Sequence, residues 1–260
     1  MYRIKIDMDD QSVRIQKWLS SLGLASRREA ETWIKQKKIM VNGKLASLGD
    51  KIVPGEDEVT INGRPVEHKP PPKVYWLLNK PPKFLTARKR QYGKKTIYDL
   101  DSLADIKFLV SPVGRLDFMT EGLLILSNDG EFVHKMTHPR FKVPRHYQVF
   151  IDGKLSSEDE QAIRRGITLE DGKVSGCELT YAHGTKYKKT DGRGSWYFIT
   201  VKEGRNRLVR RMFEHFGHKV FRLIRTGYGS VKLPDDLAQG AYRQLTSEQL
   251  RSLRDEVGLN

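Results

Sequence analysis

Three consecutive prolines, Pro70 to Pro72, divide the 260-residue sequence into a short and a long part. Proline fixes φ and has no backbone N–H group, so such a run favours an extended, semi-rigid spacer over a helix or a central strand. We therefore predict one domain over residues 1–68, a proline-rich linker over 69–73 and a second domain over 74–260.

The short part has the pattern of a small α+β module. Four apolar residues are spaced for one helix face: Ile15, Trp18, Leu19 and Leu22. Gly23 ends that helix, and Ser26 with Glu29 three residues later predicts a capping box at the start of a second helix. Two Asn-Gly pairs predict tight turns beside short strands: Asn42-Gly43 after Ile39 and Val41, and Asn62-Gly63 after residues 59–61.

The long part alternates between strand-like and helix-like segments. Strands are predicted at residues 74–78, 108–113, 123–126, 147–151, 177–182, 196–201 and 220–224. Helices are predicted at residues 132–136, 157–165, 207–216 and 247–257, and a polar hairpin turn at 186–194. This alternation, with several hairpins, predicts an α+β fold with a mainly antiparallel mixed sheet and flanking helices.

The formal charge of +15 limits the kind of partner. Such a charge predicts attraction to phosphate polymers or to anionic membranes. We find no run of about 18 apolar residues and no secretory leader, so a cytoplasmic protein that binds nucleic acid is favoured over a membrane-surface protein. Cys177 is the single cysteine and has no histidine at a metal-ligand spacing, so neither a disulfide nor a metal site is expected. A monomer is the simplest oligomeric state.

Basic residues gather in three places. Six lie within thirteen residues that contain no acid, with Phe84 and Tyr92 among them: Lys83, Arg88, Lys89, Arg90, Lys94 and Lys95. A second group consists of Arg205, Arg207, Arg222 and Arg225, and a third of Arg27 and Arg28 in the first turn of the second predicted helix. Basic side chains follow phosphates and aromatic rings stack on bases, so these residues are candidates for binding RNA. The alternative is that each group is a solvated face.

The segment 114–120, with the sequence GRLDFMT, places an acid close to a base among apolar residues. A single carboxylate such as Asp117 is poorly suited to holding a metal alone. It is well suited to act as a nucleophile or proton acceptor near a polyanion. The alternative is that Asp117 caps the turn that follows it.

The sequence resembles two known families at specific motifs. Ser26-Arg27-Arg28-Glu29-Ala30 and Val41-Asn42-Gly43 resemble the αL-type RNA-binding domain of ribosomal proteins and RNA-modifying enzymes. Residues 78–81, 113–124, 145–147, 203–212 and 223–225 resemble the RsuA/RluB/RluE/RluF group of rRNA pseudouridine synthases, in the order and spacing of that family. The resemblance is strongest to the RluB branch, which acts on large-subunit rRNA.

The resemblance implies a reaction and the residues that perform it. A uridine in ribosomal RNA would be isomerised to pseudouridine without a cofactor or metal, since no redox step or energy input occurs. Asp117 would attack the sugar, add to the base or remove a sugar proton. Tyr147 would stack on the flipped uracil and take up the proton lost from the base carbon. Arg115 would occupy the space that the uridine leaves or hold the adjacent phosphate.

Two further residues complete the site that the resemblance implies. Arg210 aligns with the basic residue that pairs with Asp117, and its neighbour Arg211 is the rival for that role. Leu223 would form an apolar wall of the base pocket. Each candidate also has a purely structural interpretation: a buried strand residue for Tyr147 or Leu223, and a surface cation for Arg115 or Arg210.

Alternative functions remain open on sequence grounds. A synthase that acts on small-subunit rRNA belongs to the same class of enzyme. A ribosome assembly factor that binds rRNA without catalysis belongs to another class, and the intact Asp117, Tyr147 and Arg210 argue against it.

Overall fold

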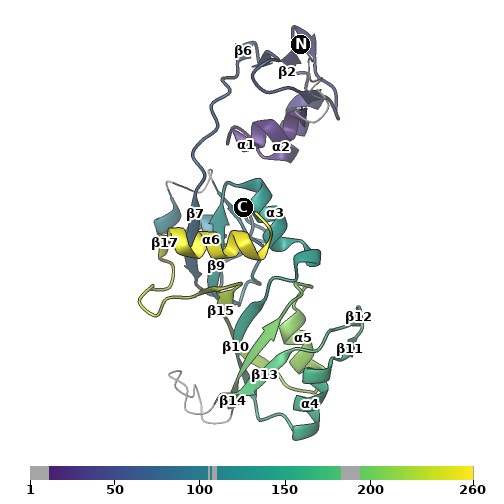
Figure 1. Ribbon diagram of the computed structural model, residues 1–260, viewed down its shortest axis with the longest axis vertical. Helices are drawn as coiled ribbons and strands as arrows, with labels where there is room; N and C mark the ends of the chain where they lie inside the picture. Colours follow the sequence, from purple (N-terminus) through teal and green to yellow (C-terminus); the bar gives the residue numbers. More distant parts are fainter. Residues whose placement is uncertain (1–11, 105, 107–109, 183–193, 260) are drawn as a thin grey trace, which may run out of the picture. The chain divides into compact units, whose positions relative to one another are not determined.

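The computed structural model describes residues 12–104, 106, 110–182 and 194–259, and its backbone contacts form two compact units, Met1–Lys73 and Val74–Asn260. Figure 1 shows the elements of both units. The predicted hairpin turn at 186–194 falls, apart from Gly194, outside the described residues. No helix in the described ranges is both long and apolar enough to cross a membrane.

The smaller unit is a helical pair followed by short antiparallel strands. Its elements are β1 (Val13–Arg14), α1 (Ile15–Ser21), α2 (Arg27–Lys35), β2 (Ile39–Val41), β3 (Lys44–Leu45), β4 (Lys51–Ile52), β5 (Val59–Ile61) and β6 (Arg64–Pro65). The strands form a sheet in the order β3-β2-β5-β6, and β1 pairs with β4. The predicted capping box is present, because the Ser26 hydroxyl accepts from the N–H of Glu29 and the Glu29 carboxylate accepts from the N–H of Ser26.

Both predicted Asn-Gly turns form two-residue hairpin connections. Asn42 and Gly43 have φ angles of 49° and 75°, and Asn62 and Gly63 have φ angles of 51° and 76°. Type I′ turns require this left-handed backbone at both central residues, which is why Asn and Gly are favoured there.

One large sheet organises the larger unit. Its strands are β7 (Tyr75–Lys80), β8 (Ser111–Pro112), β9 (Glu121–Ser127), β10 (Arg145–Asp152), β13 (Glu178–Tyr181), β14 (Gly194–Val201), β15 (Val220–Tyr228), β16 (Val231–Lys232) and β17 (Tyr242–Gln244). The order is β13-β14-β10-β15-β9-β7-β17, with β8 beside β9 and β16 beside β15. Only the β9–β15 pair among these described strands is parallel, which confirms a mixed and mainly antiparallel sheet. The short strands β11 (Thr168–Leu169) and β12 (Gly172–Lys173) pair separately.

Helices cover the two faces of this sheet. They are α3 (Gly130–Thr137), α4 (Ser157–Arg165), α5 (Leu208–Glu214) and α6 (Ser247–Glu256), with short 3₁₀ turns η2 (Ile97–Asp99), η3 (Asp101–Leu103) and η4 (Pro139–Phe141). Figure 1 shows α3 and α6 beside β7 and β9, and α4 and α5 beside β10, β13 and β14. Leu123 and Ile125 of β9 pack in one core with α3 and α6, whereas Leu124 and Leu126 belong to the core with α4 and α5. Strand β9 is therefore buried on both faces.

Several predicted bounds differ from the structure by a few residues, and some short strands were not predicted. Helix α5 begins at Leu208, because Arg207 has a left-handed backbone with φ of 49°. Of the predicted strand at 108–113, only Ser111–Pro112 forms a strand among the described residues. Strand β17 was not predicted, because Tyr242–Gln244 is a short edge segment without an alternating apolar pattern.

Gly122 permits the parallel contact between β9 and β15. It lies opposite Arg225 and has a φ of 99°. A Cβ atom at this position would overlap the Arg225 carbonyl oxygen. Glycine is therefore required both by the backbone conformation and by the close approach of the two strands.

We expect Gly122→Ala to lower the free energy of unfolding of the larger unit by roughly 2–4 kcal/mol, through backbone strain and displacement of β15. Chemical denaturation of the full chain measures this change. Gly130→Ala is the matched control, because Gly130 has no heavy atom within 4 Å of an added Cβ, and we expect it to be close to neutral. Equal stability of the two variants would contradict the proposed constraint.

Candidate functional site

A cavity of about 850 Å³ lies in the larger unit and collects four of the five residues predicted for catalysis or for the base pocket. Arg115, Asp117, Tyr147 and Leu223 all line it. Its wall also includes residues of the 85–91 and 203–209 segments and four further predicted or neighbouring cations: Arg145, Arg205, Arg207 and Arg225. Segments far apart in the sequence thus meet around one hollow.

Hydrogen bonds hold the loop that carries Asp117. The Thr86 hydroxyl donates to the Leu116 carbonyl oxygen at 2.8 Å and accepts from the Leu116 N–H at 3.2 Å. The N–H of Lys83 donates to the Phe118 carbonyl oxygen at 2.7 Å. The N–H of Thr120 donates to the Asp117 carbonyl oxygen at 3.0 Å. The Asp117 side chain is half-buried at the cavity wall, on a loop that leads directly into β9.

A buried lysine supports the same loop from the interior. Lys80 has no exposed surface, and its Nζ donates to the carbonyl oxygens of Thr120 at 2.8 Å and Pro81 at 2.9 Å. Burial lowers the pKa of Lys80 to about 8, while the negative charges of Glu121 and Asp117 act in the opposite direction. The motif at 78–81 marked this segment in the sequence, but no role for Lys80 followed from it.

Tyr147 and Leu223 lie on neighbouring strands at the cavity. Tyr147 of β10 faces Arg225 of β15, and Leu223 faces Val149. Both side chains are also members of the hydrophobic core that packs against α4 and α5. The structural and functional interpretations of these two residues are therefore compatible.

Arg225 is not an exposed cation: it is 1% exposed, and it lines the cavity. Its Nε donates to the Leu123 carbonyl oxygen at 2.7 Å, and its guanidinium carbon lies 4.8 Å from the centroid of the Tyr228 ring. Arg145 also contacts that ring, at 5.2 Å. Burial between three adjacent strands places the Arg225 charge in the cavity wall instead.

Arg210 is buried near the site but does not pair directly with Asp117. It is 6% exposed, and its Nη1 donates to the Val220 carbonyl oxygen at 3.0 Å. Within the described residues, Nε and Nη2 of Arg210 have no hydrogen-bond partner, and no ion pair joins Arg210 to Asp117. Burial and the charge of Arg207 lower the pKa of Arg210, whereas the charge of Asp117 raises it. The two side chains thus interact through their charges without forming an ion pair.

The rival Arg211 is engaged elsewhere. Its Nη1 and Nη2 each lie 2.8 Å from a carboxylate oxygen of Asp171, and its Nε donates to the Asn206 carbonyl oxygen. Neither Arg210 nor Arg211 is among the residues that line the cavity, but of the two only Arg210 has a pKa shift to which the charge of Asp117 contributes. The geometry therefore favours Arg210 over Arg211 as the cation that serves Asp117.

Several of the predicted RNA-binding cations already have protein partners. Arg88 donates to the Val110 carbonyl oxygen, Arg90 pairs with Asp99, Arg205 pairs with Glu203 and Asp171, and Arg207 pairs with Glu214. Lys83, Lys89, Arg27 and Arg28 are exposed. These four exposed cations have no ion pair among the described residues, so they are the more direct candidates for contact with phosphate.

Among the residues that the structure describes, no group of three or more His, Cys, Asp or Glu side chains could hold a metal ion. Burial raises the pKa of the Cys177 thiol to about 11, which disfavours the reactive thiolate.

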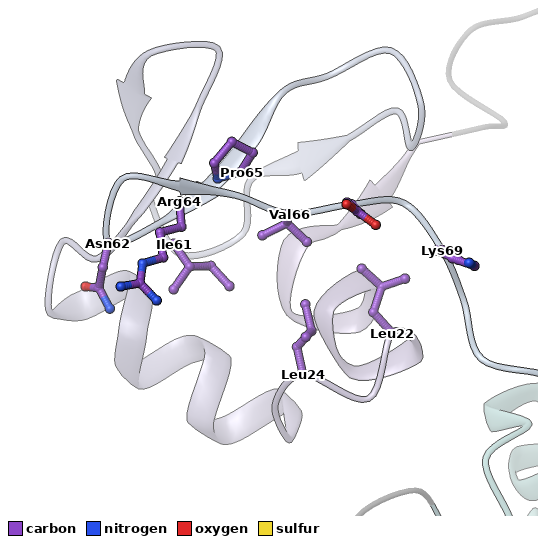
Figure 2. A pocket seen from close by; sticks show the side chains of 9 residues that line it. Leu22, Leu24, Ile61, Asn62, Arg64, Pro65, Val66 and Lys69 are labelled. Atoms are coloured by element: carbon purple, nitrogen blue, oxygen red, sulfur yellow. The ribbon is translucent and has the colours of Figure 1, made fainter.

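A second hollow, of about 840 Å³, lies in the smaller unit and shares no residue with the first. Figure 2 shows Leu22 and Leu24 reaching from the loop after α1 toward Val66. Arg64 and Lys69 are among its polar lining residues. None of the predicted catalytic side chains is part of this hollow.

Comparison with known proteins identifies relatives over both units. Residues 74–215 match the family of RNA pseudouridylate synthases, and residues 13–59 match the S4 domain. An uncharacterized RNA pseudouridine synthase of Aquifex aeolicus is 43% identical over 249 residues, covering 95% of this chain and 96% of the relative. Ribosomal large subunit pseudouridine synthase B of Bacillus subtilis is 40% identical over 242 residues, covering 93% of this chain and 95% of the relative. A crystal structure of a pseudouridylate synthase superposes with a TM-score of 0.64 at 27% identity, covering 93% of this chain and 99% of that one.

Lys80 provides a test of the site's electrostatics. The pKa of Lys80 is about 8 in the folded chain, against an ordinary value of 10.5 that applies to the unfolded chain. Between pH 8 and 10.5, Lys80 is therefore protonated in the unfolded chain and mostly neutral in the folded chain. The free energy of unfolding rises with pH across that range, because the unfolded chain binds more protons. Lys80→Met removes this dependence. We expect the free energy of unfolding of the wild type, relative to the variant, to increase by up to about 3 kcal/mol between pH 8 and 10.5. Denaturation of both proteins at several pH values measures this increase. A difference in the free energy of unfolding that does not change with pH would contradict the lowered pKa of a buried Lys80.

Proposed function

The chain belongs to the RNA pseudouridylate synthase family, and we propose that its substrate is a uridine of large-subunit ribosomal RNA. It is an isomerase with an S4 domain that binds RNA. The observation that carries the proposal is one cavity that holds Asp117 beside Tyr147 and Leu223 in a chain of charge +15. The name of the Bacillus subtilis relative favours the large-subunit target over the small-subunit one.

Asp117 is the residue that we propose to act on the sugar or the base of that uridine. Its loop is held by Thr86 and by the buried Lys80, so the carboxylate has a defined position at the cavity wall. The surrounding positive charges of Lys80, Arg210 and Arg225 are compatible with a negative reacting group. Nucleophilic attack and proton removal both require such an ordered carboxylate.

The other residues of the cavity would hold the base. We propose that Tyr147 stacks on the flipped uracil and accepts its proton, and that Leu223 forms an apolar wall. Arg115 is exposed at the cavity and can occupy the place that the uridine leaves or contact a phosphate. Nε and Nη2 of Arg210, which have no hydrogen-bond partner among the described residues, would donate to Asp117 or to substrate in the RNA complex.

The S4 domain would increase the affinity for rRNA. Arg27 and Arg28 are exposed in the first turn of α2, where the free N–H groups of the helix start also favour anions. We propose that this turn contacts RNA phosphate. The reaction has no net redox change, so the proposal includes no cofactor; a cytoplasmic location and a monomeric state stay predictions.

We expect Asp117→Ala to lower the rate of pseudouridine formation in unmodified large-subunit rRNA at least about 1000-fold, because the reacting group is lost. Chemical mapping of pseudouridine in the RNA measures this rate. Asp236→Asn is the control, since Asp236 is exposed and pairs only with Arg243 among the described ion pairs. Undiminished activity of the alanine variant would reject Asp117, and a wild type that modifies no rRNA would favour the assembly-factor alternative.

We expect Arg27→Ala with Arg28→Ala to weaken rRNA affinity roughly tenfold and to reduce the salt dependence of binding by about one to two released ions. Filter binding at several salt concentrations measures both quantities. Lys35→Ala with Lys38→Ala removes the same charge near the other end of α2 and should have a smaller effect. Equal losses in the two double variants would indicate a general charge effect instead of a site.

A further inference from the structure

The loop at residues 85–96 ends in a tight turn with an aromatic residue at its tip. Tyr92 and Gly93 have φ angles of 50° and 70°, and the N–H of Lys94 donates to the Gln91 carbonyl oxygen at 3.0 Å. This is the geometry of a type I′ turn. Tyr92 is 95% exposed, so its ring contributes almost nothing to the core.

Two other turns in the chain provide an internal comparison. The turns at Asn42-Gly43 and Asn62-Gly63 have nearly the same φ angles, and both hold Asn where this turn holds Tyr92. Asn tolerates the left-handed conformation because its short polar side chain bonds locally, whereas a bulky side chain is disfavoured there. Neither turn preference nor burial accounts for an aromatic residue at position 92, and such local strain commonly marks a functional position.

The turn is attached firmly to the catalytic loop. Gln91, next to Tyr92, lines the cavity that contains Asp117. The Nζ of Lys94 lies 4.7 Å from the centroid of the Phe118 ring, and Arg90 donates to both carboxylate oxygens of Asp99. Together with the Thr86 contacts to Leu116, these interactions fix the tip close to the mouth of the cavity.

The chemistry around the ring indicates its partner. Basic residues precede and follow Tyr92 in the sequence, and two of them, Lys89 and Lys95, are exposed. Residues 83–95 contain no acid. An exposed ring between cations suits an unpaired nucleobase whose adjacent phosphates meet the basic side chains.

We propose that Tyr92 is a stacking platform for an unpaired base of the substrate RNA, next to the uridine that enters the cavity. The inference rests on the proposed function of that cavity. It adds a contact outside the cavity, made by a side chain that takes no part in the reaction.

Tyr92→Asn is the decisive variant, because Asn already occupies the same position in two turns of this chain. We expect its affinity for unmodified large-subunit rRNA, transcribed in vitro, to fall about 5- to 150-fold through loss of one stacked base. Its thermal unfolding midpoint should equal or exceed that of the wild type, since the backbone strain is relieved. Tyr92→Phe keeps the ring and should bind as the wild type does.

Salt dependence separates stacking from charge. Tyr92→Asn removes no charge, so the slope of affinity against salt should stay that of the wild type, whereas Lys95→Ala should make it shallower. Wild-type affinity in Tyr92→Asn, equal weakening in Tyr92→Phe or an altered slope in Tyr92→Asn would overturn the proposal.

Pseudouridine formation by the wild type is measured on the same RNA. If it occurs while Tyr92→Asn binds normally, only the stacking role fails; if it does not occur, the proposed function fails.

Discussion

The parallel contact between β9 and β15 is the constraint on which the site depends. It occurs at Gly122 and Arg225, in a sheet whose other described pairs are antiparallel. Strand β9 begins directly after the loop of Asp117, and Arg225 faces Tyr147 on its other side. Joining these strands therefore brings together an acid, an aromatic ring and the apolar Leu223, which are far apart in the sequence. Any residue larger than glycine at position 122 would oppose that arrangement.

Three buried cations lie near the site, and each donates hydrogen bonds to backbone carbonyl oxygens, which carry no net charge. Lys80 donates to two carbonyl oxygens, Arg225 to the Leu123 carbonyl oxygen, and Arg210 to the Val220 carbonyl oxygen. Each carbonyl oxygen accepts from one of these nitrogens but does not cancel the charge, so a positive potential remains around Asp117. Glu121 is held differently, by Arg222 at 2.8 Å and by Gln239 at 2.6 Å, and so it is already paired. Glu121 thus has a structural role, whereas Asp117 has no ion pair among the described residues.

The cavity and the proposed RNA contact at Tyr92 are linked through one short segment. The 85–96 loop supports Asp117 through Thr86, contributes Gln91 to the cavity and presents Tyr92 outside it. A substrate that contacts the tip would therefore be positioned relative to Asp117 by a continuous set of contacts. The S4 domain provides a separate surface for RNA, which suits a large substrate that needs more than one point of attachment.

Local chemistry determined what the sequence by itself could predict. The capping box at Ser26, the Asn42-Gly43 turn and the bounds of α4 depend on neighbouring residues, so periodicity and turn preference identified them. The motif around Asp117 likewise indicated the family, and it is the source of the proposal that Asp117 is the reacting group. The tertiary structure alone decided the burial of Lys80 and Arg225 and the separation of Arg210 from Asp117. Charged residues are usually exposed, and whether a given one is buried depends on carbonyl oxygens that distant strands supply.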